Sequence, residues 1–239
     1  MYLEGRGVPQ SYEKAAAFFC MIGGRNRADP WRRMNDETVS SAGPLEDVME
    51  RAKSGNADAQ YILGLRYNSR YHGYDFEEAA KWFRLAAEQG HVSAIYEAGK
   101  LYWRGRGVVS NRDKAEELFR LAAEHGHMRA QYRMAKTIMI VIEDDGRMVN
   151  YEDAVKWYRL AAEQGCADAK YDLSRMYRLG KGVPQDEEKA VRLLKEAAEQ
   201  GYADAQCDLG MMYHRGNGVP TDHEEAVKWF KLFIGPSKD

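Results

Sequence analysis

Apolar and small residues recur along this chain at spacings of three and four, which places them on one face of an α-helix. The pattern comes in units with two halves. In the first half a small residue is followed by a large apolar residue, a second small residue and usually Tyr, as over residues 59–67. The second half carries alanines around an aromatic or leucine pair, as over residues 79–87. Each unit therefore predicts two amphipathic helices that pack on each other.

The unit repeats along most of the chain. The run Ala-Ala-Glu-Gln-Gly occurs at 86–90, 161–165 and 197–201, with a His variant at 122–126. Gly55, Gly90, Gly126, Gly165 and Gly201 close successive units at separations of 35, 36, 39 and 36 residues. Such a period is typical of stacked helical pairs. The sequence thus predicts an all-α solenoid of antiparallel helix pairs.

The predicted organisation is one continuous solenoid domain. Five helix pairs cover residues 57–90, 91–126, 127–165, 166–201 and 202–234, after truncated and degenerate repeats over 1–56 and before a tail at 235–239. Residues 1–9 align with 212–220, so the chain is expected to begin in the last turn of a first helix. Irregular loops are expected near 71–74 and 144–148, where two units depart from the pattern.

One register on the first helices holds only small residues. These are Gly64, Gly99, Ala135, Ser174 and Gly210. A larger side chain there would push the two helices of a pair apart, so close packing is expected at this point.

Helix ends are marked as clearly as helix faces. A side chain able to cap a helix N-terminus stands four residues before the first alanine of every second helix: Ser11, Asp75, Asn111, Asn150, Asp186 and Asp222. The glycine after each second helix suits the left-handed C′ position. Gly-x-Gly-Val turns at 5–8, 105–108, 180–183 and 216–219 join two helices rather than a strand and a helix, which favours a structural turn over a phosphate site.

Spacing, turn and caps together closely resemble the SEL-one-like repeat (SLR), a relative of the tetratricopeptide repeat, over roughly residues 57 to 234. The matching pattern is Ala-x3-Leu-Gly-x2-Tyr-x2-Gly-x-Gly-Val, followed by Asp, Lys-Ala, an aromatic pair and Ala-Ala-x-x-Gly. The resemblance implies a right-handed superhelix that acts mostly as an adaptor, regulator or inhibitor. It also implies that partners bind on the concave side.

The resemblance to the tetratricopeptide repeat also implies which residues line the concave face, namely those at three positions on each first helix. In this chain they hold a tyrosine ladder and a short basic row, from which we select ten candidate residues. These are Tyr61, Tyr96, Lys100, Trp103, Tyr132, Lys136, Tyr171, Arg175, Arg178 and His214. Aromatic and cationic side chains suit a protein partner with an acidic or carboxylate-bearing segment. Two structural alternatives stay open: the tyrosines pack between neighbouring units, and the Lys/Arg row is a solvated face.

A second candidate surface is the last helix. Phe233 and Ile234 replace the alanine pair of earlier units. Terminal repeats normally present a polar outer face, so this edge is expected to pair with a second molecule, giving a homodimer, or to join the partner interface.

Charge and composition argue against nucleic-acid binding and membrane insertion. A net charge of −2 in 239 residues gives no field for nucleic acid, and no apolar run approaches the length needed for membrane insertion. Cys20, Cys166 and Cys207 are odd in number and lack a disulfide framework. The cysteines favour a cytoplasmic location, with the periplasm as the alternative if an N-terminal signal was trimmed.

No motif in the chain predicts catalysis, a metal site or a cofactor. His125 and His127 lack a third ligand, and acidic pairs such as Glu77 and Glu78 suit first helical turns. The sequence thus favours a non-enzymatic binding module, of which a bacterial toxin-immunity protein is one concrete form. Two alternatives are a hydrolase or β-lactam-binding enzyme, as suggested for some cysteine-rich SLR proteins, and a self-associating scaffold.

Overall fold

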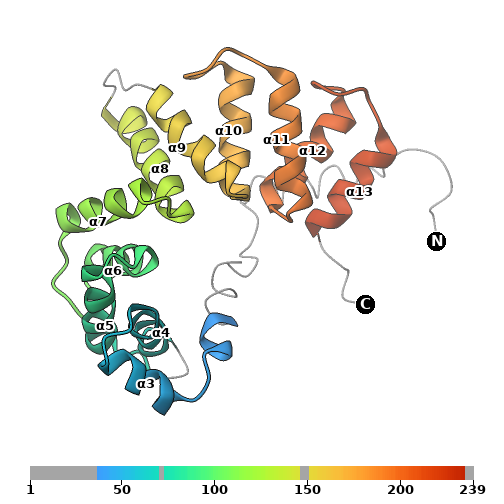
Figure 1. Cartoon of the computed structure of the whole chain (residues 1–239). Helices are drawn as coiled ribbons and strands as arrows, with labels where there is room; N and C mark the ends of the chain where they lie inside the picture. Colours follow the sequence, from blue (N-terminus) through green and yellow to red (C-terminus); the bar gives the residue numbers. More distant parts are fainter. Residues whose placement is uncertain (1–36, 70–72, 146–150, 235–239) are drawn as a thin grey trace. The chain divides into compact units, whose positions relative to one another are not determined.

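The computed structural model describes residues 37–69, 73–145 and 151–234, with side chains left out over 140–145. All regular elements in these ranges are helices (Figure 1). After a short helical stretch at 37–41 they follow in the order α3 (Leu45–Lys53), α4 (Ala57–Tyr67), α5 (Phe76–Glu88), α6 (Val92–Arg104), α7 (Arg112–Glu124), α8 (Met128–Asp145), α9 (Tyr151–Glu163), α10 (Ala167–Leu179), α11 (Glu187–Glu199), α12 (Ala203–Arg215) and α13 (His223–Ile234).

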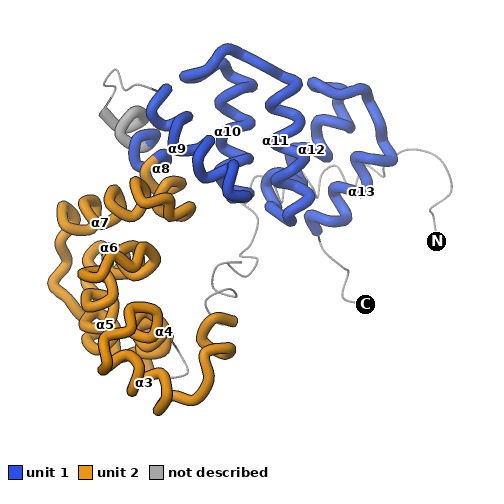
Figure 2. The backbone as a smooth tube through the Cα atoms, viewed as in Figure 1, with its two compact units in different colours: residues 1–27, 135–239 blue, residues 28–134 orange. Residues whose placement is uncertain are grey.

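The described residues form two compact units (Figure 2). The N-terminal unit covers residues 37–134 and the C-terminal unit covers residues 135–234. In each unit a first helix packs on the second helix of its own pair, as in α4 with α5, α6 with α7, α10 with α11 and α12 with α13. First helices also pack on the preceding second helix, as α6 does on α5 and α12 on α11. This stacking confirms the predicted fold class.

The small-residue register is the point of closest approach within a pair. A Cβ added to Gly64 would lie 2.6 Å from the ring of Phe83, and one added to Gly210 would lie 2.6 Å from Phe230. Gly99 faces Phe119 in the same way. These phenylalanine rings are buried against the glycine backbone, so the prediction that a larger residue would separate the helices is confirmed.

Side-chain caps occur where the sequence predicts them. Asp75 accepts a hydrogen bond from the Glu78 N–H at 3.0 Å, and Asn111 accepts one from Lys114 at 2.9 Å. Asp186 and Asp222 cap α11 and α13 in the same manner. Ser11 and Asn150 lie outside the described residues. Since each cap satisfies an N–H that has no partner within the helix, the helix starts are set by these single side chains.

The glycine turns are structural, as predicted. The five glycines that close the units have φ between 80° and 95°, the left-handed conformation of a helix C′ residue. At the Gly-x-Gly turn after α6, a side chain on Gly107 would overlap the Phe76 carbonyl at the start of α5. The second glycine of this turn is therefore needed for contact with the preceding helix pair.

One repeated link was not predicted. The buried Gln60 donates from Nε2 to the Ala52 carbonyl at 3.1 Å, and Gln206 donates to Ala198 at 3.0 Å. Gln131 makes the same bond to Ala123 at 3.2 Å. Each glutamine lies in the first turn of a first helix and satisfies a carbonyl near the end of the preceding second helix, so it joins adjacent helix pairs.

Two irregular regions differ in their outcome. The loop expected near residue 144 begins later than predicted, because residues 144 and 145 continue α8 as helix; residues 146–150 lie outside the described part. Near the first unit's turn, Tyr74 has a positive φ of 57° and its ring stacks on Phe76 at 5.5 Å between centroids.

Candidate functional site

The ten candidate residues fall into both units. Tyr61, Tyr96, Lys100, Trp103 and Tyr132 belong to the N-terminal unit, while Lys136, Tyr171, Arg175, Arg178 and His214 belong to the C-terminal unit. Each lies on a first helix or its extension, as expected. The surroundings of these residues differ between the two units, so each unit is described by itself.

The tyrosines pack across adjacent helix pairs. Tyr61 stacks on the His91 imidazole with 4.5 Å between ring centroids, and Tyr96 stacks on His127 at 4.4 Å. Tyr171 packs at 5.1 Å on Tyr202. Tyr96 is only 7% exposed, and burial raises the pKa of its hydroxyl. The ladder thus contributes to the contacts between successive helix pairs.

The histidines in these stacks also cap helices, a role that the sequence analysis missed. His91 Nδ1 accepts a hydrogen bond from the Ala94 N–H at 3.1 Å, and His127 Nδ1 accepts one from Ala130 at 3.3 Å. Burial lowers the pKa of both imidazoles, for His127 to about 4 with a further contribution from Arg129 and Lys100. The available signal was Asn56, a strong N-cap residue at the corresponding position.

Part of the predicted basic row is already neutralised. Lys100 Nζ donates to both carboxylate oxygens of Glu97, at 2.8 and 2.6 Å, and Glu97 is buried. Lys136 Nζ lies 3.7 Å from Asp172 Oδ2. In the part of the chain that the structure describes, only Arg175 of these three cations forms no ion pair with a carboxylate. The row is therefore less cationic than its sequence indicates.

In the C-terminal unit the surroundings of the ladder are acidic. Tyr171 Oη donates to Asp208 Oδ2 at 3.0 Å. Burial raises the pKa of Asp204, and the carboxylates of Asp208 and Asp172 raise it further. Arg175 lies near enough to Tyr171 to lower the pKa of its hydroxyl, against the larger raising effects of burial and Asp208.

In the N-terminal unit, by contrast, arginines gather around an exposed tryptophan. The Arg133 guanidinium lies 4.5 Å from the Trp103 ring centroid and 4.2 Å from that of Phe119, and Arg112 lies 5.4 Å from Trp103. Burial lowers the pKa of Arg133, and the charge of Arg104 lowers it further. We call Trp103, Arg104, Arg112 and Arg133 the arginine cluster. Of its members the sequence analysis selected Trp103 alone, because the arginines come from three different elements.

Comparison with known proteins bears on what such surfaces do. The family model of the Sel1 repeat matches residues 1–21, 57–91, 92–127, 129–166, 167–202 and 203–233. The chain belongs to the Sel1 repeat family. These Sel1 repeats include the stretch 1–21, whose structure is not among the described residues. No protein with a curated description matches the chain.

Solved structures agree with the family. A Sel1 repeat protein from Oxalobacter formigenes is 31% identical with a TM-score of 0.68, covering 83% of this chain and 81% of its own. A protective antigen with an SLR fold, present in uropathogenic Escherichia coli, is 26% identical with a TM-score of 0.68. The match covers 96% of this chain but only 49% of the antigen. An immunity protein from Pseudomonas aeruginosa is 18% identical with a TM-score of 0.52, covering 96% and 83%. At that identity the last comparison shows the fold alone.

The last helix of the Sel1 array presents the predicted apolar edge. Trp229 and Phe230 pack inward, as expected. Phe233 is half-buried, whereas Ile234 is 44% exposed. Whether a second molecule covers this edge stays a prediction.

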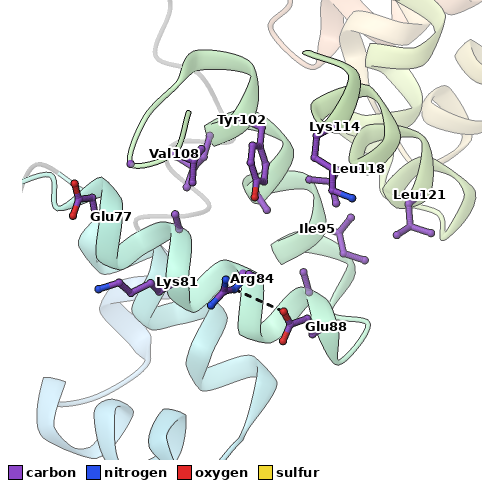
Figure 3. A pocket seen from close by; sticks show the side chains of 15 residues that line it. Glu77, Lys81, Arg84, Glu88, Ile95, Tyr102, Val108, Lys114, Leu118 and Leu121 are labelled. Atoms are coloured by element: carbon purple, nitrogen blue, oxygen red, sulfur yellow. Dashed lines mark ion pairs between the residues drawn. The ribbon is translucent and has the colours of Figure 1, made fainter. Parts of the chain in front are cut away.

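A groove lies on another side of the Sel1 repeats of the N-terminal unit, between α5, α6 and α7 (Figure 3). Its cavity has a volume of about 530 Å³ and a mainly apolar lining that includes Ile95, Leu118 and Leu121. Charged side chains at the rim of the groove form an ion pair with each other: Arg84 Nε lies 3.7 Å from Glu88 Oε1. The sequence analysis missed the groove because its width depends on the spacing of helices from two repeats.

Among the described residues there is no cluster of three His, Cys, Asp or Glu side chains that could hold a metal ion. None of the helices described is both long and apolar enough to cross a membrane. Cys166 is buried and lies outside any disulfide, whereas Cys207 is disulfide-bonded. The expectation of a chain without disulfides therefore does not hold for Cys207.

Proposed function

We propose that this Sel1 repeat protein is a non-enzymatic binding module that acts as an adaptor, regulator or inhibitor of one protein partner. The observation that carries the proposal is the contrast between packing and surface positions. The glycine–phenylalanine contacts recur from pair to pair, whereas Arg133 of α8 corresponds to Asp172 of α10 and Asp208 of α12. Such differences in charge from repeat to repeat suit a partner that does not itself repeat.

The partner is expected to place carboxylates on the first-helix face of the N-terminal unit. Arginine side chains with exposed aromatic neighbours are common energetic centres of protein interfaces. The concave tyrosines contribute there through packing between repeats rather than as the main binding groups. The corresponding face of the C-terminal unit, with Asp204 and Asp208, suits neutral or basic groups of the same partner.

Toxin immunity is the concrete form of inhibition that we propose. The supporting observation is a fold shared with an immunity protein from Pseudomonas aeruginosa. The physical requirement is modest, because an inhibitor needs only a stable surface that covers its target's active site. The Sel1 array can supply such a surface without catalytic groups of its own.

The compartment depends on the cysteines. An odd cysteine count favours the cytoplasm, but the disulfide at Cys207 favours an oxidising compartment such as the periplasm. We therefore propose the periplasmic alternative. Fractionation of the native host, with cytoplasmic and periplasmic marker proteins, tests it: recovery of the chain with the cytoplasmic marker would contradict this placement.

The function is tested with the proteins encoded beside this chain's gene. Each is co-expressed with the tagged chain, and binding is measured by isothermal titration calorimetry on purified components. We expect one neighbour to bind with a Kd below about 1 μM and to lose its own activity in the complex. Failure of every neighbour to bind, or hydrolysis of the β-lactam nitrocefin by the purified chain, would contradict the proposal.

A further inference from the structure

The arginine cluster of the N-terminal unit is where cationic side chains gather without carboxylate partners. Arg104, Arg112 and Arg133 form no ion pair with the described acidic residues, although Glu116 is near enough to raise the pKa of Arg133 slightly. Elsewhere in the unit, Lys81, Lys100 and Lys114 are each paired with a glutamate. The cluster thus differs from these paired lysines.

We infer that the arginine cluster binds an acidic peptide segment of the protein partner, through charge-assisted hydrogen bonds from its guanidinium groups to Asp or Glu carboxylates. This inference rests on the proposed function and names the contact that the partner uses. It replaces Lys100, Lys136 and Arg175 as the main cationic binding groups, because two of those three are occupied within the chain.

Geometry prepares the central arginine for this role. The guanidinium of Arg133 contacts the rings of both Trp103 and Phe119, at 4.5 and 4.2 Å from their centroids. These two contacts hold the planar group in place, and a guanidinium presents its N–H donors in the fork geometry that matches a carboxylate. The side chain therefore loses little further conformational entropy when a carboxylate binds.

Electrostatics favours an anion at the same place. Arg104 is close enough to Arg133 to disfavour the charged form of the Arg133 guanidinium, which burial disfavours more strongly. A carboxylate between them would remove this repulsion and replace water as the partner of several N–H groups. Access is open, since Trp103 is 37% exposed and both Arg104 and Arg112 lie on the surface.

A peptide fits these observations better than a nucleic acid does. The chain carries a net charge of −2, and the first-helix face of the C-terminal unit is acidic around Asp204 and Asp208. A chain of net negative charge offers no extended cationic surface to a phosphate backbone, whereas a short acidic segment needs only the cluster itself.

The test uses the full chain and a fluorescein-labelled peptide of about a dozen residues built from Glu, Asp, Ala and Leu. Its control peptide has Gln and Asn in place of the acids, and a single-stranded oligonucleotide of equal charge serves as the nucleic-acid probe. Fluorescence anisotropy gives Kd over a salt series. The variant Arg104→Gln/Arg112→Gln removes two exposed cluster charges, and Arg51→Gln/Arg120→Gln removes two exposed charges elsewhere in the same unit.

We expect the acidic peptide to bind the wild type more tightly than the neutral peptide does, with an affinity that falls as salt is added. The cluster variant should raise Kd at least about threefold and flatten the salt dependence, while the control variant stays close to wild type. Both variants should melt at the wild-type temperature, because all four arginines are exposed.

Three results would overturn the inference: no binding of the acidic peptide to the wild type, equal weakening by both variants, or tighter cluster-dependent binding of the oligonucleotide. None of them decides the proposed function, which stands or falls on binding of a genomic neighbour to the wild-type chain. If that neighbour binds the cluster variant as tightly as the wild type, the partner uses another surface and the inference fails alone.

Discussion

At the residue scale, equivalent positions in successive repeats hold different residues with different structural roles. The residue before each first helix is Asn56, His91, His127, Cys166 or Tyr202. Asn56, His91 and His127 cap their helices, whereas Cys166 and Tyr202 make no cap hydrogen bond. His127 adds a ring stack on Tyr96 to its cap. A position that looks variable in the sequence is thus a place where capping and packing compete.

The cap at His127 makes stability depend on pH. Its folded-state pKa is about 4, below the ordinary value near 6.5, because a buried ring that accepts a hydrogen bond at Nδ1 resists protonation. The unfolded chain therefore binds more protons between these two values. Stability should be fully present above pH 6.5 and fall by on the order of 2 kcal/mol as pH drops toward 4.

Urea unfolding of the wild type and His127→Asn from pH 7 to pH 4 measures this effect. Asparagine at this position should keep the cap, as Asn56 does, but cannot titrate. The variant should lose clearly less stability than the wild type over the range, with His91 contributing equally to both proteins. Parallel pH curves would show that His127 titrates normally in the folded chain.

At the element scale, three kinds of local feature determine where the helices begin, where they end and how closely they pack. Capping side chains start them, left-handed glycines end them, and the small-residue register brings the two helices of a pair together. The buried glutamines then connect one pair to the next, with a bond that neither helix could make alone. Cohesion between repeats thus depends on a few polar contacts as well as on apolar packing.

Loss of the glutamine link should weaken this connection. Gln206→Leu keeps the size of the side chain but leaves the Ala198 carbonyl without its side-chain donor in a buried place. The carbonyl keeps the Gly201 N–H as a donor, so we expect the loss of one hydrogen bond, about 0.5–1.5 kcal/mol in urea unfolding. Gln185→Leu, on an exposed turn, is the matched control and should change stability by less than about 0.5 kcal/mol. Equal effects of the two substitutions would assign no role to the link.

At the scale of the whole molecule, repeat arrays are held together by contacts between neighbours, so the exposed faces are left for association. The Sel1 repeats described here offer three such faces: the arginine cluster, the groove between α5 and α7, and the apolar end of α13. Of these three faces, the arginine cluster is the one for which we propose a partner of defined charge.

The apolar end of α13 is predicted to drive self-association. Ile234 and the neighbouring Leu232 are exposed by 44% and 51%, and Phe233 is half-buried. Size-exclusion chromatography with light scattering should show a dimer of the wild type and a monomer of Phe233→Ser/Ile234→Ser, since the double change removes the apolar area. Lys231→Ser, on the same helix, is the control. A monomeric wild type at concentrations of about 100 μM would contradict the prediction.

The amino-acid sequence by itself determined the helix pairs, their caps and the glycine register. Periodicity and caps depend on neighbours within a turn or two of the same helix, and the glycine register recurs at the same place in successive repeats. Asp75, Gly99 and Gly107 could each be assigned a role from spacing alone. The family resemblance also gave the right class of fold and pointed to Trp103 as a surface residue.

Only the tertiary structure decided which charges are free and which are paired. Lys136 and Asp172 come from different repeats, and Arg112 and Arg133 meet at Trp103 from separate helices. Lys100 is bound by Glu97 of its own helix. Neighbouring helices bury this carboxylate, so it would be destabilising without a cationic partner. These pairings depend on distances between helices, which a local pattern does not contain. For the same reason the sequence identified a basic row, whereas the structure indicates an arginine cluster.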